Sequence, residues 1–116
     1  MLCVDDNHDT ADSEVMLLQL AGFYARACYS GPTAHLEAAE FLPHICLIDM
    51  NMPGMDGDEV AVRLRQIGRP LVLIAVTALN DDAGRRRIAA AGFDRHLLKP
   101  VSPRDLLAAV GESLGI

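Results

Sequence analysis

The chain has 116 residues, of which 51% are hydrophobic, so it is long enough for one domain with a sizeable core. Its 10 basic residues oppose 16 acidic ones, and the net charge of −6 argues against a nucleic-acid surface, which normally shows a basic patch. No apolar run approaches the roughly 20 residues that a membrane span needs, and acids at positions 5 and 6 interrupt the N-terminal run too early for a signal peptide. We therefore expect a cytoplasmic domain that itself contacts neither a membrane nor nucleic acid.

The first half of the chain contains three expected strands. Residues 1–4 form the first, and a helix should begin near His8 or Asp9, where acids favour the positive end of the helix dipole. Residues 23–29 form the second, and a glycine-proline pair then opens the second helix. The third, residues 45–48, is apolar throughout and ends at Asp49, after which proline and glycines turn the chain. An apolar run closed in this way is typical of a strand buried on both faces.

The second half continues the alternation. The third helix should begin within residues 56–58, and residues 71–76 form an unbroken apolar strand. The fourth helix is expected to be weakly held, because Gly84 lowers its stability and Ile88 is its only large apolar residue. Residues 96–98 form the fifth strand, and a serine-proline pair opens the last helix.

The helical spacing also predicts which side chains face the core. Glu14 falls one turn before Leu17 and Leu18, where an apolar residue is expected. The three arginines at residues 85–87 should form a solvated face of the fourth helix, or else serve a partner or homodimer surface. The residues expected on the inner faces of the first, second and last helices are Leu17, Leu18, Leu20, Ala21, Leu36, Ala39, Phe41, Leu106, Leu107, Val110 and Leu114.

The cysteines Cys3, Cys28 and Cys46 lie inside or beside apolar runs. Their number is odd, and they lack the close pairing of a zinc site. We expect buried, reduced thiols, as is usual in a cytosolic protein.

Strands that alternate with helices over short loops are typical of an α/β architecture, in which helices cover both faces of a parallel sheet. Right-handed crossovers restrict the topology. We expect a single domain, residues 1–116, with a five-stranded, doubly wound, flavodoxin-like sheet in the order 2-1-3-4-5 and five helices. In such a sheet the carboxyl ends of the strands share one edge, and ligands bind there.

Polar residues follow four of the expected strands. Asp5 and Asp6 follow the first, Asp49 the third, Thr77 the fourth and Lys99 the fifth. Because the first and third strands are neighbours in the expected order, the carboxylates should crowd together and repel one another. A hard divalent cation resolves that repulsion, and carboxylate oxygens with a carbonyl and waters suit magnesium.

The ammonium of Lys99 and the hydroxyl of Thr77 can bind the oxygens of a phosphoryl group. A metal on one side and these two donors on the other form the electrostatic clamp that phosphoryl transfer needs. Asp49 would then act as a carboxylate nucleophile and form an acyl phosphate. The sequence therefore predicts phosphorylation of Asp49 at the end of the third strand.

Four motifs lie in order along the chain, each at the end of an expected strand. They are Val4-Asp5-Asp6-Asn7, Leu47-Ile48-Asp49-Met50-Asn51-Met52-Pro53-Gly54-Met55-Asp56-Gly57, Val76-Thr77-Ala78 and Leu98-Lys99-Pro100. Together they resemble the response-regulator receiver domain of two-component signalling, and the resemblance covers the chain from end to end. It implies a phosphoacceptor domain rather than a conventional enzyme, with a histidine kinase or a histidine phosphotransfer protein as its partner.

The resemblance also implies a ligand set for magnesium. Asp49 is then both phosphoacceptor and metal ligand, and Asp6 is a direct ligand. Asp5 acts largely through water, and Asn51 lends its backbone carbonyl. Asn51 and Leu79, which lie two residues beyond the phosphoacceptor and the threonine, are expected to tune the lifetime of the phosphoryl group.

The resemblance assigns the phosphoryl group to Thr77, Lys99 and the Ala78 amide, and it implies a cis bond between Lys99 and Pro100. Phosphorylation would pull Thr77 inward and shift the fourth helix, the fifth strand and the fifth helix. His96 departs from the family, which usually has Tyr or Phe at this position as a second switch residue. We therefore expect His96 to give a weakened or differently tuned switch. The segment 91–101 most resembles receivers of hybrid sensor histidine kinases.

Other classes of function stay open from the residues alone. A haloacid-dehalogenase-like phosphohydrolase also uses an aspartyl nucleophile, but it needs a second acid two residues later, where this chain has Asn51. A flavin or nucleotide site needs glycines and free amides after the first strand, where Asp5 and Asp6 would repel a phosphate. An interaction domain that is never phosphorylated would not need the complete set of acids.

Overall fold

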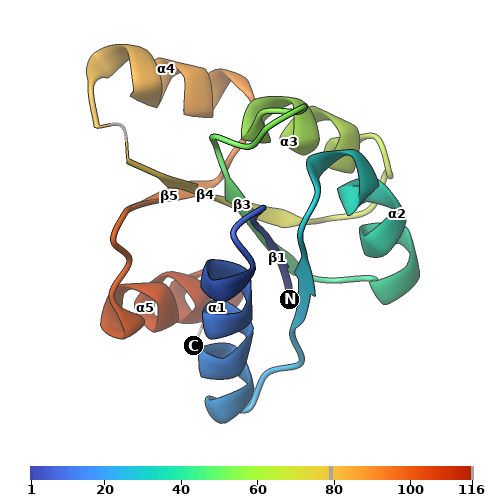
Figure 1. Ribbon diagram of the computed structural model, residues 1–116, viewed down its shortest axis with the longest axis vertical. Coiled ribbons are helices and arrows are strands. Elements are labelled where there is room, and N and C mark those ends of the chain that lie inside the picture. Colours follow the sequence, from blue (N-terminus) through green and yellow to red (C-terminus); the bar gives the residue numbers. More distant parts are fainter. Residues whose placement is uncertain (79, 116) are drawn as a thin grey trace.

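The computed structural model describes residues 1–78 and 80–115, and Figure 1 shows strands alternating with helices along this part of the chain. The strands are β1 (Leu2–Val4), β2 (Arg26–Cys28), β3 (Ile45–Asp49), β4 (Val72–Thr77) and β5 (Arg95–Leu98). The helices are α1 (His8–Leu20), α2 (Gly31–Phe41), α3 (Gly57–Arg65), α4 (Asp82–Ala90) and α5 (Pro103–Leu114). None of the described helices is long and apolar enough to cross a membrane.

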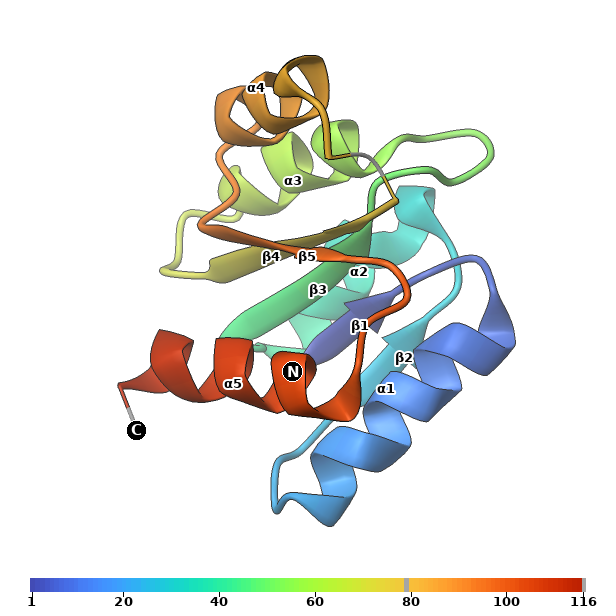
Figure 2. The ribbon, with the colours of Figure 1, turned by 90° about the vertical axis from the view of Figure 1, so that its left-hand side faces the viewer.

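The strands form one parallel sheet in the order β2-β1-β3-β4-β5. Figure 2 shows α1 and α5 on one face of this sheet and α2, α3 and α4 on the other. The doubly wound, flavodoxin-like fold expected from the sequence is therefore confirmed. Because the strands are parallel, the carboxyl ends of β1, β3, β4 and β5 lie along one edge, where a site can be built from several strands.

β3 lies in the middle of the sheet, and all of its residues are buried. Its side chains alternate between the two faces. Ile45 and Leu47 pack in the cluster beneath α1 and α5, whereas Cys46 and Ile48 pack in the cluster beneath α2 and α3. The unbroken apolar run in the sequence is thus explained by a strand that is covered on both sides. All three cysteines are buried and free, as the sequence predicted.

The inner faces of the helices differ from the expectation at several positions. Leu18 is fully buried, but Leu20 is 81% exposed, because it lies about 200° further round the helix. α2 is held by Ala34 and Ala38, one turn apart, whereas Leu36 is 61% exposed. Small alanines let α2 lie close to its neighbours, so the prediction that its large residue Leu36 faces the core was wrong. Other residues expected inside but found exposed are Ala21, Ala39 and Leu114.

α4 makes few apolar contacts, as predicted, and Ile88 is its one large buried side chain. An ion pair adds to this contact, because Arg87 Nε and Nη2 donate to the Asp58 carboxylate at 2.8 and 3.1 Å. The hydrogen bond from Arg87 holds the pKa of Asp58 below its usual range and joins α4 to the start of α3. Arg85 and Arg86 are exposed, as a solvated arginine face predicts, whereas Arg87 is 33% exposed and is paired with Asp58.

Gly57 is the first residue of α3 and is buried against the end of β3. A Cβ at this position would lie 2.6 Å from the Asp49 carbonyl oxygen and 2.8 Å from the Met50 Cα, so it would meet backbone that cannot easily move. Gly57→Ala is therefore expected to lower the free energy of unfolding by about 1–3 kcal/mol, measured by urea denaturation. Glu59→Ala, a substitution in the same helical turn, is the control and should change that value by no more than about 0.5 kcal/mol. A Gly57→Ala protein as stable as the wild type would contradict this close approach.

Candidate functional site

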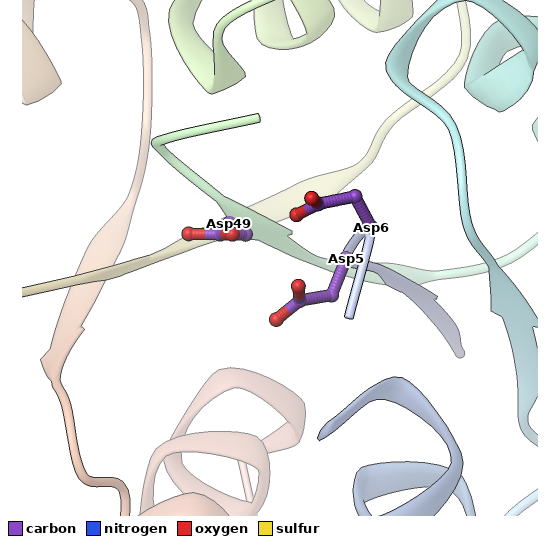
Figure 3. A group of neighbouring side chains, drawn as sticks. All are labelled: Asp5, Asp6 and Asp49. Atoms are coloured by element: carbon purple, nitrogen blue, oxygen red, sulfur yellow. The ribbon is translucent and has the colours of Figure 1, made fainter. Parts of the chain in front are cut away.

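Carboxylates meet where β1 and β3 end. Asp49 is the last residue of β3, and Asp5 and Asp6 directly follow β1. One oxygen atom of each of the three side chains lies within 4.8 Å of the others. Figure 3 shows Asp5 and Asp6 pointing toward the side on which Asp49 lies. Asp5 and Asp49 are 2% and 4% exposed, whereas Asp6 is exposed, so the acid cluster is open to solvent on one side.

Local hydrogen bonds fix the two buried acids. The Asn7 amide donates to Asp5 Oδ1 at 2.9 Å, and the Asn51 amide donates to Asp49 Oδ1 at 3.3 Å. The side chain of Asn7 in turn accepts a hydrogen bond from the Thr10 amide and so caps α1. Each acid therefore leaves its strand in a tight turn that already orients one of its oxygens.

Lys99 reaches the acid cluster from the end of β5. Its Nζ lies 3.1 Å from Asp49 Oδ1 and 3.8 Å from Asp5 Oδ2. The Lys99 amide donates to the carbonyl of Thr77 at 2.8 Å, which joins the ends of β4 and β5, and Thr77 is 1% exposed. The peptide bond between Lys99 and Pro100 is cis. The structure thus brings the ammonium and the acids together, with the threonine at the adjacent strand end.

The charges of the site act on one another. Burial raises the pKa of Asp5 to about 6, the charges of Asp49 and Asp6 add to this rise, and the Asn7 hydrogen bond and Lys99 oppose it. Burial alone would lower the pKa of Lys99, but the hydrogen bond to Asp49 and the nearby carboxylates outweigh burial, so this pKa is raised. The acid cluster and Lys99 together carry more negative than positive charge, and this imbalance favours a bound cation.

The remaining predicted residues lie on or directly after the strands. Asn51 and Ala78 follow β3 and β4, and both are exposed. His96 lies on β5, in register with Ala75 of β4, and it is also exposed. Leu79, which was expected to tune the lifetime of a phosphoryl group, lies outside the described residues.

Glu14 belongs to the surroundings of the acid cluster, although the sequence prediction did not include it in the site. It is a partly buried residue of α1, and burial raises its pKa to about 7. The charges of Asp5 and Asp49 add to this rise, and Lys99 opposes it. The signal that could have found it was an acid at a helical position where the spacing required an apolar residue.

Comparisons with known proteins agree with the geometry. Residues 1–111 match the family described as the response regulator receiver domain. The chain is 33% identical over 112 residues to an uncharacterized 14.6 kDa protein of Leptolyngbya boryana. The aligned region covers 95% of this chain and 86% of that protein. It is also 33% identical over 110 residues to the sensory transduction protein RegX3 of Mycolicibacterium smegmatis. That aligned region covers 95% of this chain and 48% of RegX3. The chain thus spans about half the length of RegX3.

A solved structure supports the same fold. The chemotaxis protein CheY4 of Vibrio cholerae superimposes with a TM-score of 0.92 at 24% identity, covering 97% of this chain and 95% of CheY4. At this identity the structural similarity supports the fold alone, whereas the family match over residues 1–111 supports membership of the family. The chain therefore belongs to the family of response-regulator receiver domains.

Proposed function

We propose that the chain is a phosphoacceptor module of a two-component phosphorelay, and that Asp49 accepts the phosphoryl group from a histidine kinase or a histidine phosphotransfer protein. The observation that carries this proposal is the convergence of the Lys99 ammonium and two further carboxylates on the acid that ends the central strand. An oxygen of Asp49 attacks phosphorus, the phosphorus–nitrogen bond of the partner's phosphohistidine breaks, and the freed imidazole takes up a proton.

The donor set fits magnesium, because it consists of hard oxygen atoms that lie close together. Asp6 and Asp49 are proposed as direct ligands, and the Asn51 carbonyl as a third. Asp5 is proposed to act through water, as the resemblance to receiver domains implies. A bound magnesium ion would offset the repulsion among the acids and neutralise charge on the incoming phosphoryl oxygens.

Lys99, the Thr77 hydroxyl and the Ala78 amide are proposed to hold the phosphoryl oxygens. The Lys99 ammonium lies 3.1 Å from Asp49 Oδ1, so it stands beside an oxygen that can receive the group. Attraction of Thr77 toward the new charge would then shift the surface formed by α4, β5 and α5. The few apolar contacts of α4 lower the free-energy cost of this movement.

His96 is proposed as a weaker or differently tuned second switch residue. Its side chain is exposed on β5, and an imidazole is smaller and more polar than the ring of Tyr or Phe. A structure of the protein with beryllofluoride and magnesium tests this proposal. A His96 ring that swings fully inward in that structure would contradict it.

The proposed setting is the cytoplasm, where histidine kinases present their phosphohistidine. The net charge of −6 supports a domain that does not itself bind nucleic acid. Attachment to a hybrid sensor kinase, homodimer formation and the absence of membrane contact by this domain stay predictions.

Incubation with acetyl phosphate and magnesium, followed by measurement of the intact mass, tests the proposed function. We expect one added phosphoryl group in the presence of magnesium and little or none after chelation with EDTA, because the unneutralised acids repel the donor. Absence of any added mass when both reagents are present would end the proposal. A phosphorylated phosphotransfer protein as the donor extends the test to the proposed class of partner.

A further inference from the structure

Glu14 lies in the stripe of α1 that faces the core. It shares this stripe with Ala11, Val15 and Leu18, which recur at helical spacing. Ala11 and Leu18 are fully buried, and Val15 packs against the cluster beneath the sheet. A carboxylate in this position is partly desolvated, so a nearby positive charge would favour its ionised form. Within residues 1–78 and 80–115, however, no hydrogen bond or ion pair reaches the Glu14 carboxylate.

Glu14 and Lys99 line the same cavity. The cavity has a volume of about 640 Å³ and lies between α1 and the segment that leads from β5 into α5. Leu17, Pro100 and Leu106 contribute apolar parts of its lining. Charges that line a cavity with apolar walls interact more strongly than they would in bulk water.

The electrostatic interactions link the same two groups. Attraction to Asp49, Asp5 and Glu14 supports the charged form of Lys99, and Lys99 in turn favours the charged form of Glu14. Asp5 and Asp49 belong to the acid cluster that could hold a metal ion, whereas Glu14 does not. Glu14 is thus a carboxylate that stays available to the ammonium when a cation occupies the acid cluster.

We propose that Glu14 is a positioning residue for Lys99, an inference that rests on the proposed function. Its carboxylate holds the ammonium beside the site when a divalent cation occupies the acid cluster. That cation repels the ammonium and weakens the attraction that Asp49 and Asp5 exert on it, so without Glu14 less attraction would keep the ammonium in place. Lys99 would then turn outward, since its side chain is already 34% exposed, and the phosphoryl group would lose a donor.

A double-mutant cycle separates this role from a structural one. The experiments are done at about pH 8.5, where Glu14, with a pKa of about 7, is ionised. Glu14→Gln keeps the size of the side chain and removes that charge. We expect it to slow phosphorylation by acetyl phosphate at saturating magnesium by about three- to tenfold, and to have no effect in the Lys99→Ala background. Glu14→Asp should restore part of the rate. Asp9→Asn is the matched control, because Asp9 is an exposed acid of α1 that lines the same cavity.

A second measurement observes Lys99 directly and needs no phosphorylation. Lys99 is the only lysine of the chain, so an isotope label on the lysine ε-carbon gives one assignable NMR signal. The signal is compared at one pH, without metal and at saturating magnesium. In the wild type and in Asp9→Asn it should move little when magnesium is added. In Glu14→Gln it should move toward the position of a solvated lysine.

The outcomes distinguish this inference from the proposed function. Equal slowing by Glu14→Gln in both backgrounds, no slowing at all, or the same Lys99 signal with and without the Glu14 charge would overturn the positioning role. If the wild type accepts no phosphoryl group, the proposed function fails. The Lys99 signal alone then decides whether Glu14 positions Lys99. Should Glu14→Gln fail to fold, Glu14→Leu, which completes the apolar stripe, replaces it in both measurements.

Discussion

Asp49→Asn is expected to abolish phosphate incorporation from acetyl phosphate, because a carboxamide oxygen cannot form an acyl phosphate. The substitution keeps the shape of the side chain. Its carboxamide oxygen can still accept a hydrogen bond from Lys99, whose Nζ lies 3.1 Å from Asp49 Oδ1. The fold should therefore be retained, and the loss should report chemistry rather than unfolding. Intact mass after incubation with magnesium and acetyl phosphate measures the incorporation of phosphate, and circular dichroism measures whether the fold is retained.

Asp12→Asn is the matched control for this loss. Asp12 is an exposed acid of α1 that accepts a hydrogen bond from the Tyr29 hydroxyl, and it is not part of the acid cluster. The control should keep full incorporation. Asp6→Asn should behave differently from both, with incorporation that is slow at low magnesium and recovers as magnesium is raised. A mass gain in Asp49→Asn equal to that of the wild type would place the phosphoryl group on another residue and contradict the proposal.

The acid cluster and Lys99 could be predicted because each of these residues directly follows an apolar run. The run that ends at Asp49 is too short for a helix and too apolar for a surface segment, so it marks a central strand. Parallel strands bring their carboxyl ends to one edge whatever the detail of the loops. Lys99 therefore reaches Asp49 although 50 residues separate them.

The features that could not be predicted depend on how helices pack. Spacing within α2 does not tell that Ala34 rather than Leu36 faces the sheet, because the angle at which a helix lies on its neighbours decides this. Arg87 and Asp58 are 29 residues apart on different helices, and no local pattern connects them. Glu14 was visible as an acid in an apolar stripe, but its relation to Lys99 depends on the cavity that α1 forms with the start of α5.

The metal-free protein is expected to become less stable as the pH rises from about 4 to about 7. The folded-state pKa values of Asp5 and Glu14 are raised to about 6 and about 7, so the folded protein keeps protons that the unfolded chain has already released. Tighter proton binding by the folded state favours folding at low pH, and this contribution is lost as the pH rises through the window. At about 1.4 kcal/mol for each pKa unit, and allowing for partial solvation and mutual interaction, we expect a loss of about 3 kcal/mol. Below this window the trend should reverse, because Asp58, whose pKa is lowered by Arg87, becomes protonated.

Urea denaturation at about pH 5 and about pH 7.5, with and without magnesium, measures this dependence. Asp5→Asn should make the metal-free protein more stable at the higher pH and flatten its pH profile, whereas Asp12→Asn should follow the wild type. Magnesium should stabilise the protein more at the higher pH, because protons compete with the cation for the acid cluster at the lower one. A metal-free protein that is equally stable at both pH values, or more stable at the higher one, would show that the buried acids carry no excess of protons when folded. In that case the crowding of charge that makes the cluster a cation site would be weaker than the geometry indicates.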